Sequence, residues 1–125
     1  MNRADWKVLV IEDETDSMEL VRGLLEYHGI ASVGASTGED ALTLLQQLSP
    51  TAIIIDLALP DIDGWGLLAK LKDNHRLGRV PRVAITAYHT AEVANKAIEE
   101  GFDAYFAKPL DAMSFVRELE SIVES

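Results

Sequence analysis

Five side chains able to take part in metal or phosphoryl chemistry directly follow short apolar segments of the chain. Two carboxylates, Glu12 and Asp13, come after the first of these segments, and Asp56 follows the most apolar one. Thr86 and Lys108 follow two others. Taken singly, each has an ordinary structural role, such as a helix cap, a turn residue or an exposed lysine. Together they make a set of three carboxylates, one hydroxyl and one ammonium group.

This set predicts a phosphoryl-accepting site with a bound Mg²⁺. Carboxylates at close range need a cation, because like charges raise one another's pKa. A site with few oxygen ligands and with room for water and phosphate suits Mg²⁺ better than Ca²⁺, which is more fully enclosed by protein oxygens. A carboxylate can attack phosphorus to form an aspartyl-phosphate, a reaction that needs positioning and charge neutralisation. We predict Asp56 as the nucleophile, Glu12 and Asp13 as metal ligands, and Lys108 and Thr86 as contacts of the phosphoryl oxygens.

The elements that must position these residues follow from the alternation of apolar segments with amphipathic stretches. Residues 36–39 have the spacing of a capping box led by Ser36, and Gly29 and Gly101 stand where helices end. We predict strands over residues 7–11, 30–35, 51–55, 82–85 and 104–106, and helices over about 14–28, 36–47, 64–73, 91–100 and 111–123. Five such units indicate an α/β fold, a doubly wound parallel sheet with helices on both faces. Ligands of such sheets bind at the carboxyl ends of the strands.

Length and composition predict one soluble domain spanning residues 1–125. The chain has 48% hydrophobic residues, enough for a core, and no cysteine, which excludes disulfides and thiolate metal sites. The N-terminus lacks the apolar run of a signal peptide, and no segment approaches the roughly 20 apolar residues of a membrane span. The net charge of −10 disfavours binding to nucleic acid or anionic lipid. The three histidines are scattered, which gives little support to a zinc site. We expect a cytoplasmic protein.

Four segments resemble the signatures of the bacterial response-regulator receiver domain, of the chemotaxis-regulator-like kind. They read VIEDE at 10–14, IDLALPDIDG at 55–64, ITA at 85–87 and AKPL at 107–110. The resemblance covers essentially the whole chain, and its motifs follow in order at compatible spacing. It implies a five-stranded sheet of flavodoxin-like order 2-1-3-4-5.

The resemblance also implies roles for single residues. Asp56 would be the phosphoacceptor, and the backbone carbonyl of Ala58 would join Glu12, Asp13 and Asp56 as a Mg²⁺ ligand. Thr86 and Lys108 would contact the phosphoryl group, and the peptide bond before Pro109 would be cis. Tyr105 matches the family's switch aromatic, which turns inward as Thr86 moves toward the phosphate.

Two side chains near the predicted site depart from common choices in the family. Ala58 is small where a larger side chain is frequent, and Tyr88 is bulky near the expected path of water. We predict that Tyr88 shields the acyl phosphate and that Ala58 leaves space beside it. Trp65 is interpreted as a packing or contact residue.

The partners implied by the resemblance are a phosphoryl donor and a protein that reads the phosphorylated state. The donor is a sensor histidine kinase or a histidine phosphotransfer domain, whose phosphohistidine meets the strand-end face. An unknown downstream protein docks on the fourth helix, last strand and last helix. The protein is then a phosphoacceptor in two-component signalling rather than an enzyme, with at most self-phosphorylation from small donors and slow self-dephosphorylation. A weak homodimer stays open, as does a receiver excised from a longer chain.

Three other functions were weighed on the same residues. A haloacid-dehalogenase-type phosphatase needs Asp-x-Asp at the strand end, but Asp56 is followed by Leu57 and Ala58. A flavodoxin-like FMN carrier needs a first loop rich in Ser, Thr and Gly, whereas residues 12–16 are mostly acidic. A pseudo-receiver would bind partners without being phosphorylated. The one argument against it is that all the residue types required for phosphorylation are present.

Overall fold

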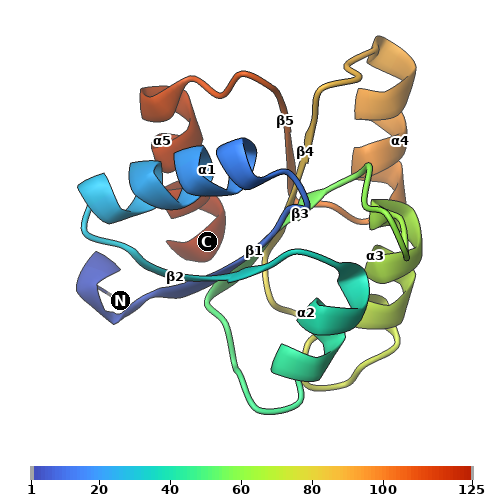
Figure 1. Ribbon diagram of the computed structural model, residues 1–125, viewed down its shortest axis with the longest axis horizontal. Helices are drawn as coiled ribbons and strands as arrows, with labels where there is room; N and C mark the ends of the chain where they lie inside the picture. The colour runs from blue at the N-terminus through green and yellow to red at the C-terminus, as the bar shows by residue number, and fades with distance from the viewer. Residues whose placement is uncertain (1, 125) are drawn as a thin grey trace.

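The computed structural model describes residues 2–124, which form one five-stranded parallel sheet wrapped by five α-helices (Figure 1). The strand order is β2-β1-β3-β4-β5, as predicted. The strands are β1 (Lys7–Ile11), β2 (Ala31–Ala35), β3 (Ala52–Asp56), β4 (Arg82–Thr86) and β5 (Ala104–Ala107). The helices are α1 (Thr15–Tyr27), α2 (Gly38–Leu44), α3 (Gly64–Lys72), α4 (Ala91–Glu100) and α5 (Ala112–Glu124), and a short 3₁₀ turn (Arg3–Asp5) precedes β1.

The two faces of the sheet carry separate hydrophobic cores. Helices α1 and α5 lie on one face, and α2, α3 and α4 lie on the other (Figure 1). In β3, Ile53 and Ile55 pack toward α2, α3 and α4, whereas Ile54 packs toward α1 and α5. Every residue of β3 is buried, as expected for a central parallel strand that helices cover on both sides. This double burial fixes the sheet and therefore the positions of its strand ends.

The helix ends confirm the glycine predictions and correct the capping box. Gly29 and Gly101 have φ angles of +75° and +120°, the left-handed conformation that ends a helix. The predicted cap Ser36 is wrong, because Thr37 is the N-cap of α2 and its hydroxyl accepts from the Asp40 amide at 3.0 Å. The next two amides of this helix donate to the carboxylate of Asp61, each at 2.9 Å. With these donors satisfied from a distant loop, the helix start needs no capping box.

Helix α2 also ends earlier than predicted, at Leu44 rather than near residue 47, and continues as turns. Among residues 2–124, none of the helices has the length and apolarity that crossing a bilayer requires.

Gly64 begins α3 at a point where only a glycine fits against the loop after β3. Its amide donates to the carbonyl of Leu57 at 3.1 Å. A Cβ at this position would lie 2.6 Å from the Leu57 Cα and 3.0 Å from the Asp56 carbonyl oxygen, both of them backbone atoms. Because backbone atoms cannot move aside as a flexible side chain does, Gly64 fixes the approach of α3 to the end of β3.

Substitution Gly64→Ala should therefore lower the free energy of unfolding by about 1–3 kcal/mol, the usual cost of overpacking a tight contact. The matched control is Gly23→Ala in the middle of α1, where a Cβ meets nothing within 4 Å. The control should raise the free energy of unfolding by about 0.5–1 kcal/mol through helix propensity. Urea unfolding of both variants measures the difference, and equal effects would contradict the close approach at Gly64.

Candidate functional site

The residues that the sequence marked for chemistry gather at the carboxyl edge of the sheet. Asp56 is the last residue of β3 and Thr86 the last of β4. Glu12 follows β1 directly, and its amide donates to the Ala35 carbonyl at 3.0 Å. Lys108 follows β5, and its amide donates to the Thr86 carbonyl at 2.9 Å. The sheet's hydrogen bonding thus continues into the site and positions these residues through the backbone.

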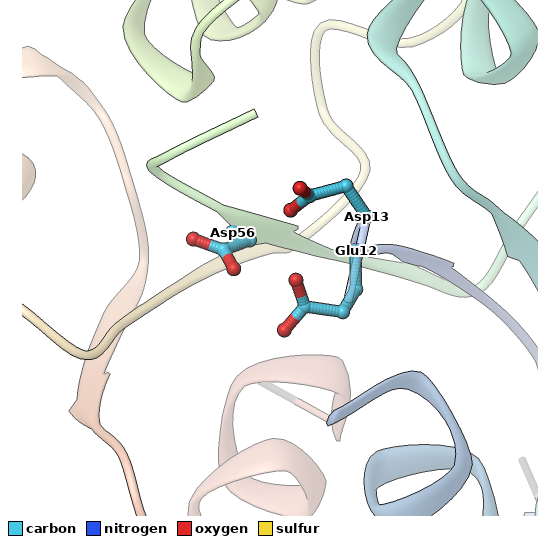
Figure 2. A group of neighbouring side chains, drawn as sticks. All are labelled: Glu12, Asp13 and Asp56. Atoms are coloured by element: carbon cyan, nitrogen blue, oxygen red, sulfur yellow. The ribbon is translucent and has the colours of Figure 1, made fainter. Parts of the chain in front are cut away.

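Three carboxylates form the acidic part of the site. Glu12, Asp13 and Asp56 each place one oxygen within 4.8 Å of the others, and Figure 2 shows their side chains beside the ends of β1 and β3. Glu12 and Asp56 are 1% and 5% exposed, whereas Asp13 is exposed to solvent. From the sequence we predicted the same role for Glu12 and Asp13. In the structure they differ, because the Glu12 side chain is buried and the Asp13 side chain lies at the surface.

Lys108 joins the two buried carboxylates. Its ammonium group donates to Asp56 Oδ2 at 2.8 Å and to Glu12 Oε1. A third, longer hydrogen bond of 3.3 Å reaches the hydroxyl of Ser17 in α1. The Lys108 side chain is only 17% exposed, so the ammonium replaces much of its hydration with these partners. Lys108 supplies one positive charge to the acidic cluster in this arrangement, and the predicted Mg²⁺ stays a prediction.

The pKa values of the buried pair are pushed apart. Burial, followed by a hydrogen bond with Asp56, raises the pKa of Glu12 to about 7. Burial also opposes ionisation of Asp56, but hydrogen bonds with Glu12, Lys108 and the Ala58 amide outweigh it and lower the Asp56 pKa. Burial alone would lower the pKa of Lys108, yet its two carboxylate partners raise it. Asp56 is therefore ionised and can serve as a nucleophile, while Glu12 titrates near neutrality.

Both oxygens of Asp56 are held in place. Oδ1 accepts from the Ala58 amide at 2.9 Å, and Oδ2 accepts from Lys108. The Lys108–Pro109 peptide bond is cis, as the resemblance implied. Nothing in the contacts of Ala58 bears on its carbonyl as a metal ligand, which stays a prediction.

The two residues predicted to form a switch lie beside the site on neighbouring strands. Thr86 is buried, and its hydroxyl oxygen accepts from the Tyr88 amide at 3.1 Å. Tyr105 is in β5, next to the strand that ends in Thr86. Its hydroxyl lies 2.9 Å from Nδ1 of His89, in the loop that follows Thr86. The geometry brings Thr86, Tyr105 and the intervening loop together, and their movement stays a prediction.

Sequence reasoning missed two polar contacts of the site. Ser17 was not singled out, although it lies in the first turn of α1, the helix that begins just after Glu12 and Asp13. His89 is one of the three scattered histidines, and no periodic signal in the sequence points to its contact with Tyr105. The packing interpretation of Trp65 is confirmed, because its ring lies 5.9 Å from that of Phe102, edge to face.

Comparison with known proteins now identifies the fold family. Residues 8–120 match the response regulator receiver domain. The chain belongs to this family. DivK of Brucella ovis, a polar-differentiation response regulator, is 30% identical over 114 residues, which cover 91% of this chain and 93% of DivK. An uncharacterized 14.6 kDa protein of Leptolyngbya boryana is 32% identical over 91% of this chain and 87% of its own length. A two-component response regulator from Clostridium difficile superposes with a TM-score of 0.87 at 26% identity, covering 96% of this chain and 97% of that one.

Membership in the receiver family confirms the resemblance and selects among the alternatives. The chain is a receiver domain of two-component signalling, which speaks against the phosphatase and the flavin carrier. Receiver domains bind Mg²⁺ at an acidic pocket. The donors here fit that ion, because they are carboxylate oxygens. Those of Glu12 and Asp56 are buried, whereas those of Asp13 are open to water. The site therefore offers carboxylate oxygens of the kind that such an ion binds, and the individual ligands stay a prediction.

The raised pKa of Glu12 predicts pH-dependent metal binding. Below about pH 7 this carboxyl holds a proton, which must leave before the oxygen can bind a cation. We expect Mg²⁺ to bind about tenfold more tightly at pH 8 than at pH 6, with release of one proton near pH 6. Calorimetry in buffers of different ionisation enthalpy measures both quantities.

The control for this titration is Glu12→Gln, which removes the group that titrates. The variant should bind Mg²⁺ more weakly and with much less dependence on pH. An affinity of the wild type that does not change between pH 6 and pH 8 would contradict the assignment of this pKa to Glu12.

Proposed function

We propose that the chain is a phosphorylation switch in which Asp56 accepts a phosphoryl group from a phosphohistidine of a sensor histidine kinase or phosphotransfer domain. The observation that carries the proposal is the ion pair of 2.8 Å between Lys108 and Asp56 Oδ2, buried beside an acidic cluster. An ionised carboxylate with an ammonium group alongside has both the nucleophile and a positive charge for the incoming phosphoryl oxygens.

In the proposed transfer, a carboxylate oxygen of Asp56 forms a bond to phosphorus as the bond from phosphorus to the donor's imidazole nitrogen breaks. The electron pair of the broken bond stays on that nitrogen. Lys108 is already within hydrogen-bond distance of Asp56, and it redirects one of its N–H hydrogen bonds to a phosphoryl oxygen. The Thr86 hydroxyl has its hydrogen free to donate, since its contact with Tyr88 uses only the oxygen.

Glu12, Asp13, Asp56 and the Ala58 carbonyl are the proposed ligands of Mg²⁺. When bound, the ion neutralises negative charge that gathers on the phosphoryl oxygens. Glu12 then has two alternative partners, since the same carboxylate binds Lys108 in this structure. Release of Lys108 from Glu12 would free its ammonium group to bind a phosphoryl oxygen.

The proposed readout is a change in the surface formed by α4, β5 and α5. Thr86 and Tyr105 connect the acceptor site with this surface, because Tyr105 is on β5 and the loop after Thr86 leads into α4. A downstream protein that binds only one arrangement of this surface reads the phosphorylated state. We propose that the receiver domain acts in the cytoplasm as a phosphoacceptor, with at most slow self-phosphorylation and self-dephosphorylation.

Incubation with acetyl phosphate and Mg²⁺ tests the acceptor. Intact mass spectrometry should show one added phosphoryl group on the wild type and none on Asp56→Asn, because the amide is a poor nucleophile. Chelation of Mg²⁺ with EDTA should abolish the adduct. The matched control is Asp73→Asn, at the far end of α3, which should be phosphorylated like the wild type.

An unmodified wild type that still binds Mg²⁺ would contradict the proposal and favour a pseudo-receiver. An adduct that persists in Asp56→Asn would move the acceptor to another residue.

Tyr88 bears on the lifetime of the phosphorylated form. This residue is 75% exposed, and its amide donates to the Thr86 hydroxyl oxygen two positions earlier. If this ring shields the acyl phosphate from water, Tyr88→Ala should shorten the phosphorylated lifetime about two- to tenfold, which corresponds to lowering the hydrolysis barrier by about 0.4–1.4 kcal/mol. Decay of phosphorylated protein after donor removal measures the lifetime, and matching lifetimes would exclude the shielding role.

A further inference from the structure

A basic pocket lies at the edge of the sheet opposite the acceptor site. It has a volume of about 330 Å³ and lies where α3 and α4 end and β4 begins. Three of its lining side chains are basic, namely Lys72, Arg79 and Arg82, and one is acidic, Asp103. These side chains give the pocket a net charge of +2, in a chain whose net charge is −10.

Arg82 is the buried member of this group. Only 3% of its surface is exposed, and it forms no salt bridge among residues 2–124. Its Nη2 donates to the carbonyl oxygens of Leu77, Gly78 and Val80 at 2.7, 2.9 and 2.8 Å, and its Nε also donates to Val80. These partners are neutral, so they orient the guanidinium group without cancelling its charge. A buried charge normally has a partner of opposite charge.

The remaining nitrogen of the Arg82 guanidinium, Nη1, has no acceptor in the part of the chain that the structure describes. The exposed carboxylate of Asp103 does not supply one, because it accepts from the Arg82 backbone amide at 2.9 Å. Burial lowers the pKa of the Arg82 guanidinium, and the charge of Asp103 offsets only part of this effect. The pocket therefore contains a buried cation with unused donor hydrogens and an incomplete counter-charge.

Lys72 and Arg79 add exposed positive charge to the pocket. The Lys72 ammonium group donates to the Glu100 carbonyl oxygen at 2.8 Å, which leaves hydrogens for other acceptors. The Arg79 side chain forms no hydrogen bond or salt bridge within residues 2–124. Donors of three basic side chains are thus available to one small ligand.

We propose that this pocket binds a phosphate dianion, either inorganic phosphate or the phosphate group of a small phosphomonoester. Phosphate oxygens accept several hydrogen bonds at once, and guanidinium and ammonium groups are the donors that bind them in proteins. Two negative charges balance the net charge of the pocket, whereas a monoanion balances half of it. The inference does not rest on the proposed function, because the pocket and Asp56 lie at opposite edges of the sheet.

Titration of the full chain with inorganic phosphate, followed by ¹H–¹⁵N NMR, tests the pocket. Mg²⁺ is omitted and chloride keeps the ionic strength constant, so that metal-dependent binding at the acceptor site and general screening do not contribute. The amide signals of Arg82, Gly101 and Asp103 should shift along one saturable curve, together with the Nε–H signal of Arg82. Acetate, a monoanion, should bind about two- to fivefold more weakly.

A second probe, β-glycerophosphate, distinguishes the two sources of the phosphate group. Binding tighter than that of inorganic phosphate assigns the pocket to a phosphomonoester, and weaker binding assigns it to the free ion.

Charge variants separate the pocket from the surface as a whole. Arg79→Gln should weaken phosphate binding about two- to fivefold, the effect of losing one exposed charge pair. Asp103→Asn should tighten binding by a similar factor, because the amide oxygen can still accept from the Arg82 amide while the repulsive charge is lost. Lys70→Gln, a matched change of charge on α3 outside the pocket, should leave the affinity unchanged.

The absence of shifts at the pocket would overturn the inference, as would shifts that fall equally on all exposed lysines and arginines without saturating. An affinity that neither Arg79→Gln nor Asp103→Asn changes would overturn it as well. Acetate binding as tight as that of phosphate would exclude a dianion as the ligand. None of these results bears on phosphorylation of Asp56, which the mass measurement tests separately.

Discussion

The burial of Glu12 and Asp56 against one ammonium group is the constraint on which the rest of the site depends. Two carboxylates with almost no exposed surface are costly to ionise together, and Lys108 offsets that cost from the end of a different strand. Because burial raises the pKa of one carboxyl while hydrogen bonds lower that of the other, the pair holds a single easily lost proton. In the proposed function, a second cation or a phosphoryl group takes the place of Lys108 at one of these two carboxylates.

The fold supplies the geometry for this balance through backbone hydrogen bonds. Glu12 and Lys108 both continue the ladders of the strands that precede them, and β3 is buried along its whole length. Gly64 lets α3 pack against the loop that follows Asp56. Both the sheet and the start of this helix therefore hold Asp56 in position. On the other side of the site, the β4–α4 loop contacts Tyr105 through the exposed His89. Such an asymmetry suits a site in which one part stays fixed and another part moves.

Much of this arrangement could be predicted from the sequence because it rests on local patterns. Short apolar segments that end in charged residues predicted the strands. Because the carboxyl ends of parallel strands meet at one edge of the sheet, the sequence also predicted that the side chains at those ends lie together, namely Glu12, Asp56, Thr86 and Lys108. The capping of α2 could not be predicted in the same way, because its donors are satisfied by Asp61, over twenty residues away. The distinct burial of Glu12 and Asp13, two neighbours of the same chemical type, likewise depends on how α1 and β5 pack. The contact of His89 with Tyr105 joins the β4–α4 loop to β5, and residue type alone gives no sign of such a tertiary contact.

The central claim is that the buried carboxylate of Asp56, and no other of the clustered acids, carries the phosphoryl group. Reduction of the phosphorylated protein with borohydride converts an aspartyl-phosphate to homoserine, which peptide mass spectrometry locates to a single residue. The account predicts homoserine at position 56 alone. Reduction at Asp13, or at several acidic residues, would contradict it, because the nucleophile would then be selected by exposure rather than by the ion pair with Lys108.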